Sequence, residues 1–286
     1  MSVATPSSAQ AEASFDTIVP ARNRFSVVSI AFWHILRRDL TVTARGFIPF
    51  LIQVLITPLS LLFVFGRVMP GVGMTQQQYP SLFLPGVIAV TIFIASLQGM
   101  SISLMLDLDS HHEIEDRLLA PIPVNLVALE KVVFTAIRSL VATAFTFLEA
   151  YLILGSRYQV QNNILLILGI LVLYTLACAA LALLLGSALT SDKIYLLFSL
   201  FLSLALYTGC VYYTWSSLSS IRALQIITLF NPVTYAAEAL RFAMVPPAGG
   251  VPLETMPLVW SLLGMSVSFL LFLWFGVRVF RKKVIS

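Results

Sequence analysis

Charged residues are scarce in this sequence. Asp, Glu, Lys and Arg make up only 10% of its 286 residues, whereas 59% are hydrophobic and the mean hydropathy is +0.94. A chain so poor in polar side chains cannot cover its own surface as a soluble domain. The composition therefore predicts an all-α integral membrane protein, because about 20 apolar residues in a helix cross the bilayer core. We expect membrane lipid as a neighbour and no nucleic acid.

Signatures of catalysis and metal binding are also missing. No Gly-Lys pair occurs anywhere, so the chain lacks a phosphate-binding loop and cannot hydrolyse ATP by that route. Cys178 and Cys210 both lie inside apolar runs, which favours small buried side chains over a disulfide or a metal site. His111 and His112 are adjacent and would point about 100° apart on a helix. We expect no catalytic residue and no metal ligand.

The N-terminal region divides into two parts. Residues 1–24 are expected to be a disordered tail, and the absence of Lys and Arg from the first 20 argues against a cleaved signal peptide. Residues 25–45 have helical spacing with opposed apolar and basic faces, which predicts an amphipathic helix at the membrane interface. The basic face holds His34, Arg37, Arg38, Thr41 and Arg45. This helix either only anchors the chain or also touches a cytoplasmic partner.

Residues 46–286 form the predicted six-helix transmembrane domain. Its apolar runs are about 20 residues long, enough to span the bilayer at about 1.5 Å rise per residue. The expected spans are Gly46–Gly66, Leu84–Leu106, Val132–Leu154, Asn163–Leu189, Ile194–Tyr213 and Leu258–Val277. An even number of spans places both termini on the same side.

Lys and Arg indicate which side this is, because short basic segments are retained in the cytoplasm. On the side of the termini lie Arg22, Arg24, Arg37, Arg38, Arg45, Arg117, Lys131, Lys193, Arg278, Arg281, Lys282 and Lys283. The opposite side has only Arg67, Arg157, Arg222 and Arg241. We therefore expect a multi-pass protein of the plasma (inner) membrane with both termini in the cytoplasm.

Two ionisable residues interrupt the third span. Arg138 and Glu149 are 11 residues apart, which puts them on one helix face but about 16 Å apart along the axis. They are too distant to pair directly. Such residues either extend to the interface or face the bundle interior, where they line a cavity or relay motion.

The stretch DSHHEIEDRLLAPIP, residues 109–123, is the most acidic part of the chain. Ser110 and Glu113 form a capping box, and Pro121 ends the predicted helix after about ten residues. Ile114 and Leu118 fall on one face of it. A helix this short is marginal in water, so it either remains a solvated loop or docks on a cytoplasmic partner.

Four motifs resemble, in order along the chain, those of the membrane subunits of type-2 ATP-binding-cassette (ABC) exporters. They are YPSLFLPGVIAV at the second span, EIEDRLLAPIPVNLVALEKV between the second and third, LYTGCVYYTW at the end of the fifth, and LFNPVTYAAEALRF before the sixth. In that family, six-helix subunits pair into a twelve-helix pathway driven by separate ATPases. The resemblance thus implies cytoplasmic ATPase partners, which bind ATP and Mg, and a second permease subunit, more naturally a homodimer than a heterodimer.

The resemblance also assigns roles to residues. The coupling segment to the ATPase would present Glu113, Ile114, Glu115, Arg117 and Leu118. The pathway would be lined from the second and fifth spans by Phe93, Gln98, Ser203, Tyr207 and Thr208. A partly re-entrant helix at the outer gate would contain Asn231, Pro232, Glu238 and Arg241. From the residues alone, this last segment is equally consistent with a plain surface helix capped by Asn231.

Two other classes fit less well. An ion-coupled secondary transporter would show inverted repeats and helices broken near the midplane, and no such repeat is found. A membrane enzyme would need clustered His, Cys or acidic residues within a span. The sequence leaves the substrate open: a drug, a lipid-linked glycan, a lipid or sodium ion would each suit an exporter.

Overall fold

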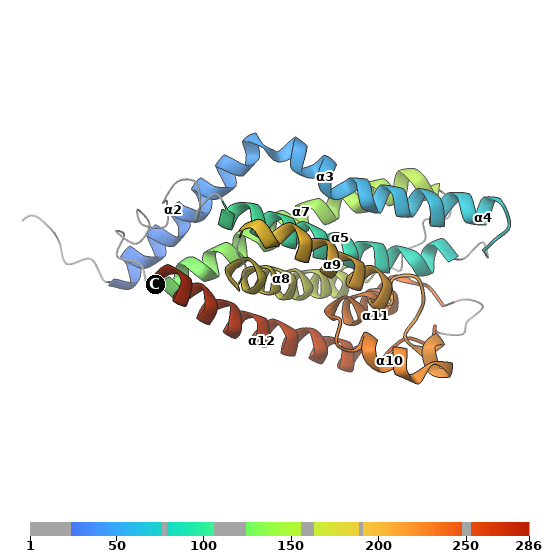
Figure 1. The fold of residues 1–286 in the computed structure, drawn as a ribbon. Coiled ribbons are helices and arrows are strands. Elements are labelled where there is room, and N and C mark those ends of the chain that lie inside the picture. Colours follow the sequence, from blue (N-terminus) through green and yellow to red (C-terminus); the bar gives the residue numbers. More distant parts are fainter. Residues whose placement is uncertain are drawn as a thin grey trace, which may run out of the picture.

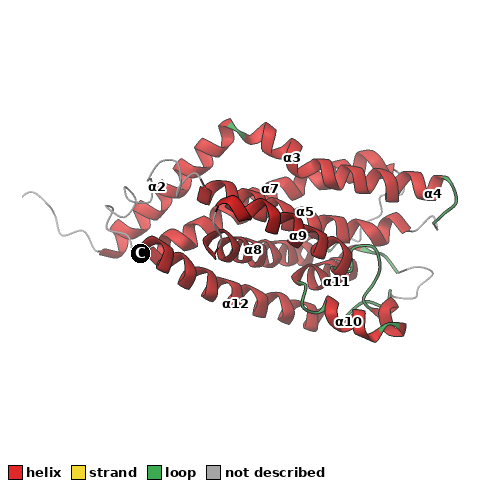
Figure 2. Ribbon diagram, in the orientation of Figure 1, coloured by secondary structure: helices red, strands yellow, loops and turns green. Residues whose placement is uncertain are grey.

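The computed structural model describes residues 24–75, 79–105, 124–155, 163–188, 191–247 and 253–285, and within these the chain is helical with no strand (Figure 2). The helices are α2 (Arg24–Arg45), α3 (Phe47–Leu61), η1 (Leu62–Val68, a π-helical stretch), α4 (Met69–Gly71), α5 (Tyr79–Met105), α7 (Val124–Leu154), α8 (Ile164–Ala188), α9 (Ser191–Thr208), η4 (Ser216–Ser220), α10 (Arg222–Thr228), α11 (Pro232–Met244) and α12 (Leu258–Ile285). The all-α fold class is confirmed.

The long helices run side by side, with α5 in the middle (Figure 1). In its most apolar window 89% of the residues are buried, against 11% for α12 and 22% for the helix over Phe47–Gly71. The beginnings of α2 and α7 lie with the C-terminus at one end of the bundle, which we call the terminal end (Figure 1). α4, α10 and α11 lie at the opposite, distal end.

Small residues allow α8 and α12 to pack closely. Ala177, Ala179, Ala180 and Ala182 of α8 are all buried. A Cβ on Gly276 of α12 would lie 3.3 Å from the Leu184 nitrogen and 3.4 Å from the Ala180 carbonyl oxygen. Such close approach gives helices in lipid their main attraction, which is van der Waals contact.

Hydroxyl groups join α5 to α7. The Ser96 and Ser139 hydroxyls are buried and 2.9 Å apart, and Ser139 also donates to the Thr135 carbonyl one turn earlier. A hydroxyl satisfied within its own helix can be buried in an apolar bundle at little cost, and a hydrogen bond between helices then fixes their register.

Five described helices are long and apolar enough to cross a membrane: Phe47–Gly71, Tyr79–Met100, Val124–Leu154, Ile164–Ala188 and Leu258–Lys283. They coincide with five of the six expected spans. The other expected span, Ile194–Tyr213, overlaps α9, which is 18 residues long and ends at Thr208, before the expected end at Tyr213. The observed helix is shorter than expected because the chain bends sharply after Thr208.

Candidate functional site

The bend after α9 brings the chain against α5. Cys210 has φ of 50°, in the left-handed region that non-glycine residues seldom adopt. Gly86 of α5 faces this bend, and a Cβ there would come 2.8 Å from the Val211 Cα and collide with the Val211 carbonyl oxygen. Glycine at position 86 therefore lets helix and bend touch backbone to backbone.

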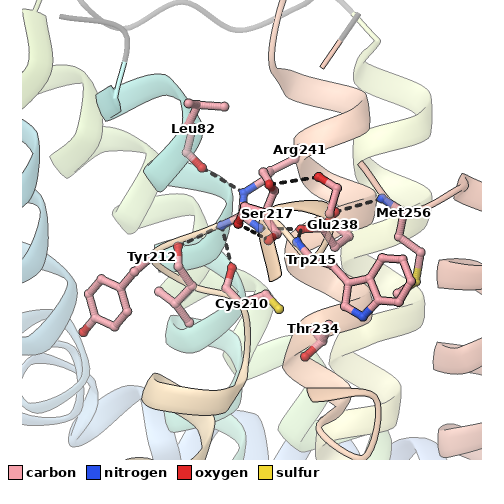
Figure 3. Close-up of polar contacts among 12 residues, drawn as sticks. Leu82, Cys210, Tyr212, Trp215, Ser217, Thr234, Glu238, Arg241 and Met256 are labelled. Atoms are coloured by element: carbon pink, nitrogen blue, oxygen red, sulfur yellow. Dashed lines mark hydrogen bonds and ion pairs between the residues drawn. The ribbon is translucent and has the colours of Figure 1, made fainter. Parts of the chain in front are cut away.

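α11 contributes two buried charges next to this bend. Glu238 and Arg241 lie three residues apart, and their Oε1 and Nη1 atoms form a 2.8 Å ion pair. The two side chains are 0% and 1% exposed. Buried charges are stable only when their remaining polar atoms also find partners, and Figure 3 shows that both side chains do.

Arg241 donates to three backbone carbonyls besides Glu238. Its Nε donates to Leu82 of α5 at 3.0 Å, and its Nη2 donates to Cys210 at 2.6 Å and Val211 at 2.8 Å (Figure 3). These carbonyls belong to a helix and to the bend, so one planar guanidinium joins three segments. A lysine offers a single point of attachment and could not span them.

Glu238 accepts hydrogen bonds on both carboxylate oxygens. Oε1 accepts from the Trp215 amide at 3.0 Å, and Oε2 accepts from the Met256 amide at 2.9 Å. We call the set Leu82, Cys210, Val211, Trp215, Glu238, Arg241 and Met256 the Glu238–Arg241 cluster. It connects α5, the bend, α11 and the segment that leads into α12.

Asn231 fastens the start of α11 to the end of α9. Its Oδ1 caps the helix by accepting from the Val233 amide at 3.0 Å, and Pro232 occupies the first helical position, as expected from the sequence. Its Nδ2 donates to the Thr208 hydroxyl at 3.0 Å. α11 is not a plain surface helix, because ten of its 13 residues are buried.

The arrangement of the cluster is that of a clamp rather than a reactive centre. Arg241 donates four hydrogen bonds, and both oxygens of Glu238 accept hydrogen bonds, so the polar atoms of both side chains are used to hold protein segments. The Cys210 thiol lies beyond the end of α9, and burial raises its pKa to about 11, which keeps it neutral. The cluster therefore holds α5, the bend, α11 and the segment before α12 together.

Arg138 and Glu149 lie on α7, away from the cluster. The Arg138 guanidinium carbon is 3.6 Å from the centre of the Phe50 ring of α3, a cation–π contact. The Arg138 Nε and the Glu149 Oε2 are buried without a hydrogen-bond partner among the described residues. Arg138 therefore packs between helices, which the sequence left open, and its aromatic partner was not predicted.

A second buried ion pair was also missed by the sequence reasoning. Lys131 Nζ of α7 lies 2.9 Å from Asp39 Oδ2 of α2, with side chains 2% and 9% exposed. A signal was available, because Asp39 is the only acidic residue in residues 24–45. The expected helix over 25–45 is present as α2, and His34, Arg37, Arg38 and Thr41 are exposed on it.

Comparison with known families agrees with this architecture. The model of the family described as ABC-2 type transporter matches residues 30–245. The chain belongs to this family. It is thus a transmembrane subunit of an ABC transporter, a multi-pass transport component rather than an enzyme. No curated protein matches the chain in a direct sequence comparison.

The pathway residues expected of this ABC-2 type transporter are not brought together within one chain. Phe93 of α5 is 2% exposed in the core, and Gln98 is half-buried with no described partner for its Oε1. On α9, Ser203 is exposed and Tyr207 is 70% exposed, whereas Thr208 binds Asn231. The α9 residues thus face outward while Phe93 faces inward.

The predicted coupling residues lie outside the described part of this ABC-2 type transporter. Glu113, Ile114, Glu115, Arg117 and Leu118 fall between the end of α5 at Met105 and the start of α7 at Val124. Both of these helix ends lie at the terminal end of the bundle (Figure 1). Their role stays a prediction.

Proposed function

We propose that this chain forms the pathway of an ATP-driven exporter for a drug, a lipid or a glycan, together with a second copy of itself and separate ATPase subunits. The observation that carries the proposal is the family match over residues 30–245. Because the chain has no Gly-Lys pair, ATP and Mg bind the partner ATPases.

The coupling segment is the proposed contact with the ATPase. It connects α5, the most buried helix, to α7, so that a push on residues 110–120 reaches the bundle core. The ion pair between Lys131 and Asp39 lies seven residues into α7 and would pass the same motion to α2. Because the starts of α2 and α7 and the C-terminus lie at one end, cytoplasmic termini would place this segment in the cytoplasm (Figure 1).

A second copy is proposed to pack on the exposed apolar side of α9. Leu200, Leu204 and Tyr207 are 50%, 48% and 70% exposed, and they fall on one helical face. An exposed apolar face of this kind on a membrane protein contacts either lipid or another helix. Pairing there would bring Ser203 and Tyr207 of two copies toward a shared pathway.

The experiment uses the complex purified from membranes through a tag on this chain. We expect an ATPase subunit to copurify and to hydrolyse ATP faster in the presence of transported substrate. The double variant Glu113→Lys/Glu115→Lys should abolish that stimulation and leave membrane insertion unchanged. Glu254→Lys, an exposed carboxylate before α12, is the control and should behave as the parent does. Unchanged stimulation in the double variant would refute the coupling role.

Orientation is tested separately with tags. A reporter after Ser286 and a tag at residue 115 should both report cytoplasm, and a tag at residue 249 should report the outside. A tag at 115 reporting outside would overturn the proposed coupling side.

A further inference from the structure

A large groove runs along the last turns of α12. Its volume is ≈ 1220 Å³. Asn125 of α7 closes one side, and the remaining lining residues come from α12: Leu270, Leu271, Leu273, Trp274, Phe275, Val277, Arg278, Val279, Arg281 and Lys282. The lining residues thus place the groove along the C-terminal part of α12 and beside the start of α7, and these two helix ends lie at the terminal end of the bundle (Figure 1).

The lining changes in character along the helix. From Leu270 to Phe275 it is apolar, with Leu270 63% and Leu271 50% exposed. From Arg278 to Lys282 it is basic, and none of the described residues that line the groove is acidic. α12 begins at Leu258, and about 20 helical residues cross the hydrocarbon core, so Arg278, Arg281 and Lys282 lie where the helix leaves it. This is the depth of phospholipid headgroups.

Packing fixes which side of α12 is open. Gly276 lies against the α8 backbone, so α12 cannot rotate to bury the groove face without losing that contact. Trp274 and Arg278 are one turn apart on the open side, and the guanidinium carbon is 4.2 Å from the centre of the indole ring. An aromatic ring and a cation held together at this depth suit a ligand that is apolar at one end and anionic at the other.

We propose that the groove is a binding site for an anionic phospholipid of the leaflet at the terminal end, with its acyl chains along Leu270, Leu271 and Trp274 and its phosphate near Arg278, Arg281 and Lys282. Small-molecule pockets usually enclose roughly 300–1,000 Å³. This groove is larger and elongated along α12, which fits an amphiphile. The basic rim, which has no acidic counterpart among the described lining residues, selects negative charge. The site does not depend on ATP hydrolysis or on the transported substrate.

The test uses the full-length chain purified in a nonionic detergent and titrated with dibrominated phosphatidylglycerol, whose bromines quench nearby tryptophans. Subtracting the quenching of Trp274→Phe isolates the signal from the groove. Dibrominated phosphatidylcholine serves as the comparison lipid, because its headgroup has no net charge. Soluble glycerol phosphate is added as a competitor that has the phosphate but no acyl chains.

Charge variants then locate the headgroup. Each basic residue near an anionic lipid surface contributes enough to change affinity about fivefold. Arg281→Gln should weaken phosphatidylglycerol binding by about that factor, and Lys282→Gln should do so independently. Arg222→Gln, which removes an exposed arginine at the distal end, is the matched control and should leave binding unchanged. Gel filtration confirms that each variant remains monodisperse.

The proposal is supported if phosphatidylglycerol binds more tightly than phosphatidylcholine and only the α12 variants lose this preference. It is overturned if the two lipids bind equally, or if Arg222→Gln weakens binding as much as Arg281→Gln. Competition by glycerol phosphate as strong as by the lipid would show a simple anion site instead. Absence of any Trp274-dependent quenching would show that another protein segment covers the groove.

Discussion

The two ends of the bundle hold their buried charges in different ways. At the distal end, Glu238 and Arg241 belong to one helix and reach backbone groups of α5, the bend after α9 and the segment before α12. At the terminal end, Lys131 and Asp39 come from two helices and meet side chain to side chain. Separating the first pair disturbs the backbone of several segments, whereas separating the second moves one helix against another. The distal end is thus built as a clamp and the terminal end as a joint.

The largest effect should come from opening the clamp. Arg241→Met leaves the Glu238 carboxylate buried without its cation and frees three carbonyls, which should cost about 3–5 kcal/mol of stability. Thermal unfolding can be followed by the labelling of Cys178 and Cys210, both buried in the native chain, with a maleimide dye. Arg222→Met, an exposed arginine of α10, should change stability by about 0.5 kcal/mol or less. Equal melting of the two variants would show that the cluster does not act as a clamp.

The second-largest effect should come from the close contact between Gly86 of α5 and the backbone of Val211 in the bend. Gly86→Ala places a methyl group against the Val211 backbone, which cannot yield as a side chain can, so we expect a loss of about 1–3 kcal/mol. Gly169→Ala is the matched control, since it also changes a helical glycine but has open space around it. That variant should be neutral or stabilising by up to about 1 kcal/mol. Labelling of the cysteines on heating measures both, and equal melting of the two variants would contradict the close approach.

Part of the clamp could be predicted from the sequence, because some of its features depend only on residues that are close together in the chain. The Asn231 cap, Pro232 at the first helical position and the Glu238–Arg241 spacing all follow from one short stretch. The burial of α11 did not follow, because it depends on Gly86 and on carbonyls at Leu82 and Cys210, far away in the chain.

The Lys131–Asp39 joint was also not predicted, because it too depends on residues that are far apart in the chain. Asp39 and Lys131 are 92 positions apart, and each has an ordinary role when considered alone, as part of an interfacial helix or as a flanking charge. Arg138 and Phe50 are likewise brought together only by helix packing. Apolar runs, by contrast, predicted six spans, and five of these coincide with described helices long enough to cross a membrane, because bilayer thickness sets helix length locally.

The third effect concerns the joint. A double-mutant cycle with Asp39→Asn, Lys131→Met and the combined variant should give a coupling energy of roughly 1–2 kcal/mol, within the 0.5–3 kcal/mol seen for contacting residues. A parallel cycle of Asp39→Asn with Arg222→Gln, at opposite ends of the bundle, should be additive to about 0.5 kcal/mol. If the joint carries motion from the ATPase, the single variants should also lower substrate-stimulated ATP hydrolysis more than they lower stability. Additivity in the first cycle would rule out the joint.

The smallest effect should come from the contact of Arg138 with the Phe50 ring, which lies between the two ends of the bundle. Here an aromatic ring, and not an opposite charge, is the partner of a cation. The Arg138 guanidinium lies over Phe50, and its Nε has no hydrogen-bond partner among the described residues, so the ring is the partner that the geometry provides. Phe50→Leu keeps an apolar side chain in the core but removes the negative face of the ring. A cycle of Phe50→Leu with Arg138→Met should therefore show a coupling of about 0.5–1 kcal/mol, followed by the same cysteine labelling. Phe63→Leu on the exposed side of the same membrane-crossing segment is the control and should show no coupling to Arg138→Met. If Phe50 and Phe63 couple equally to Arg138, the guanidinium is held by general packing, and the ring contributes area rather than charge recognition.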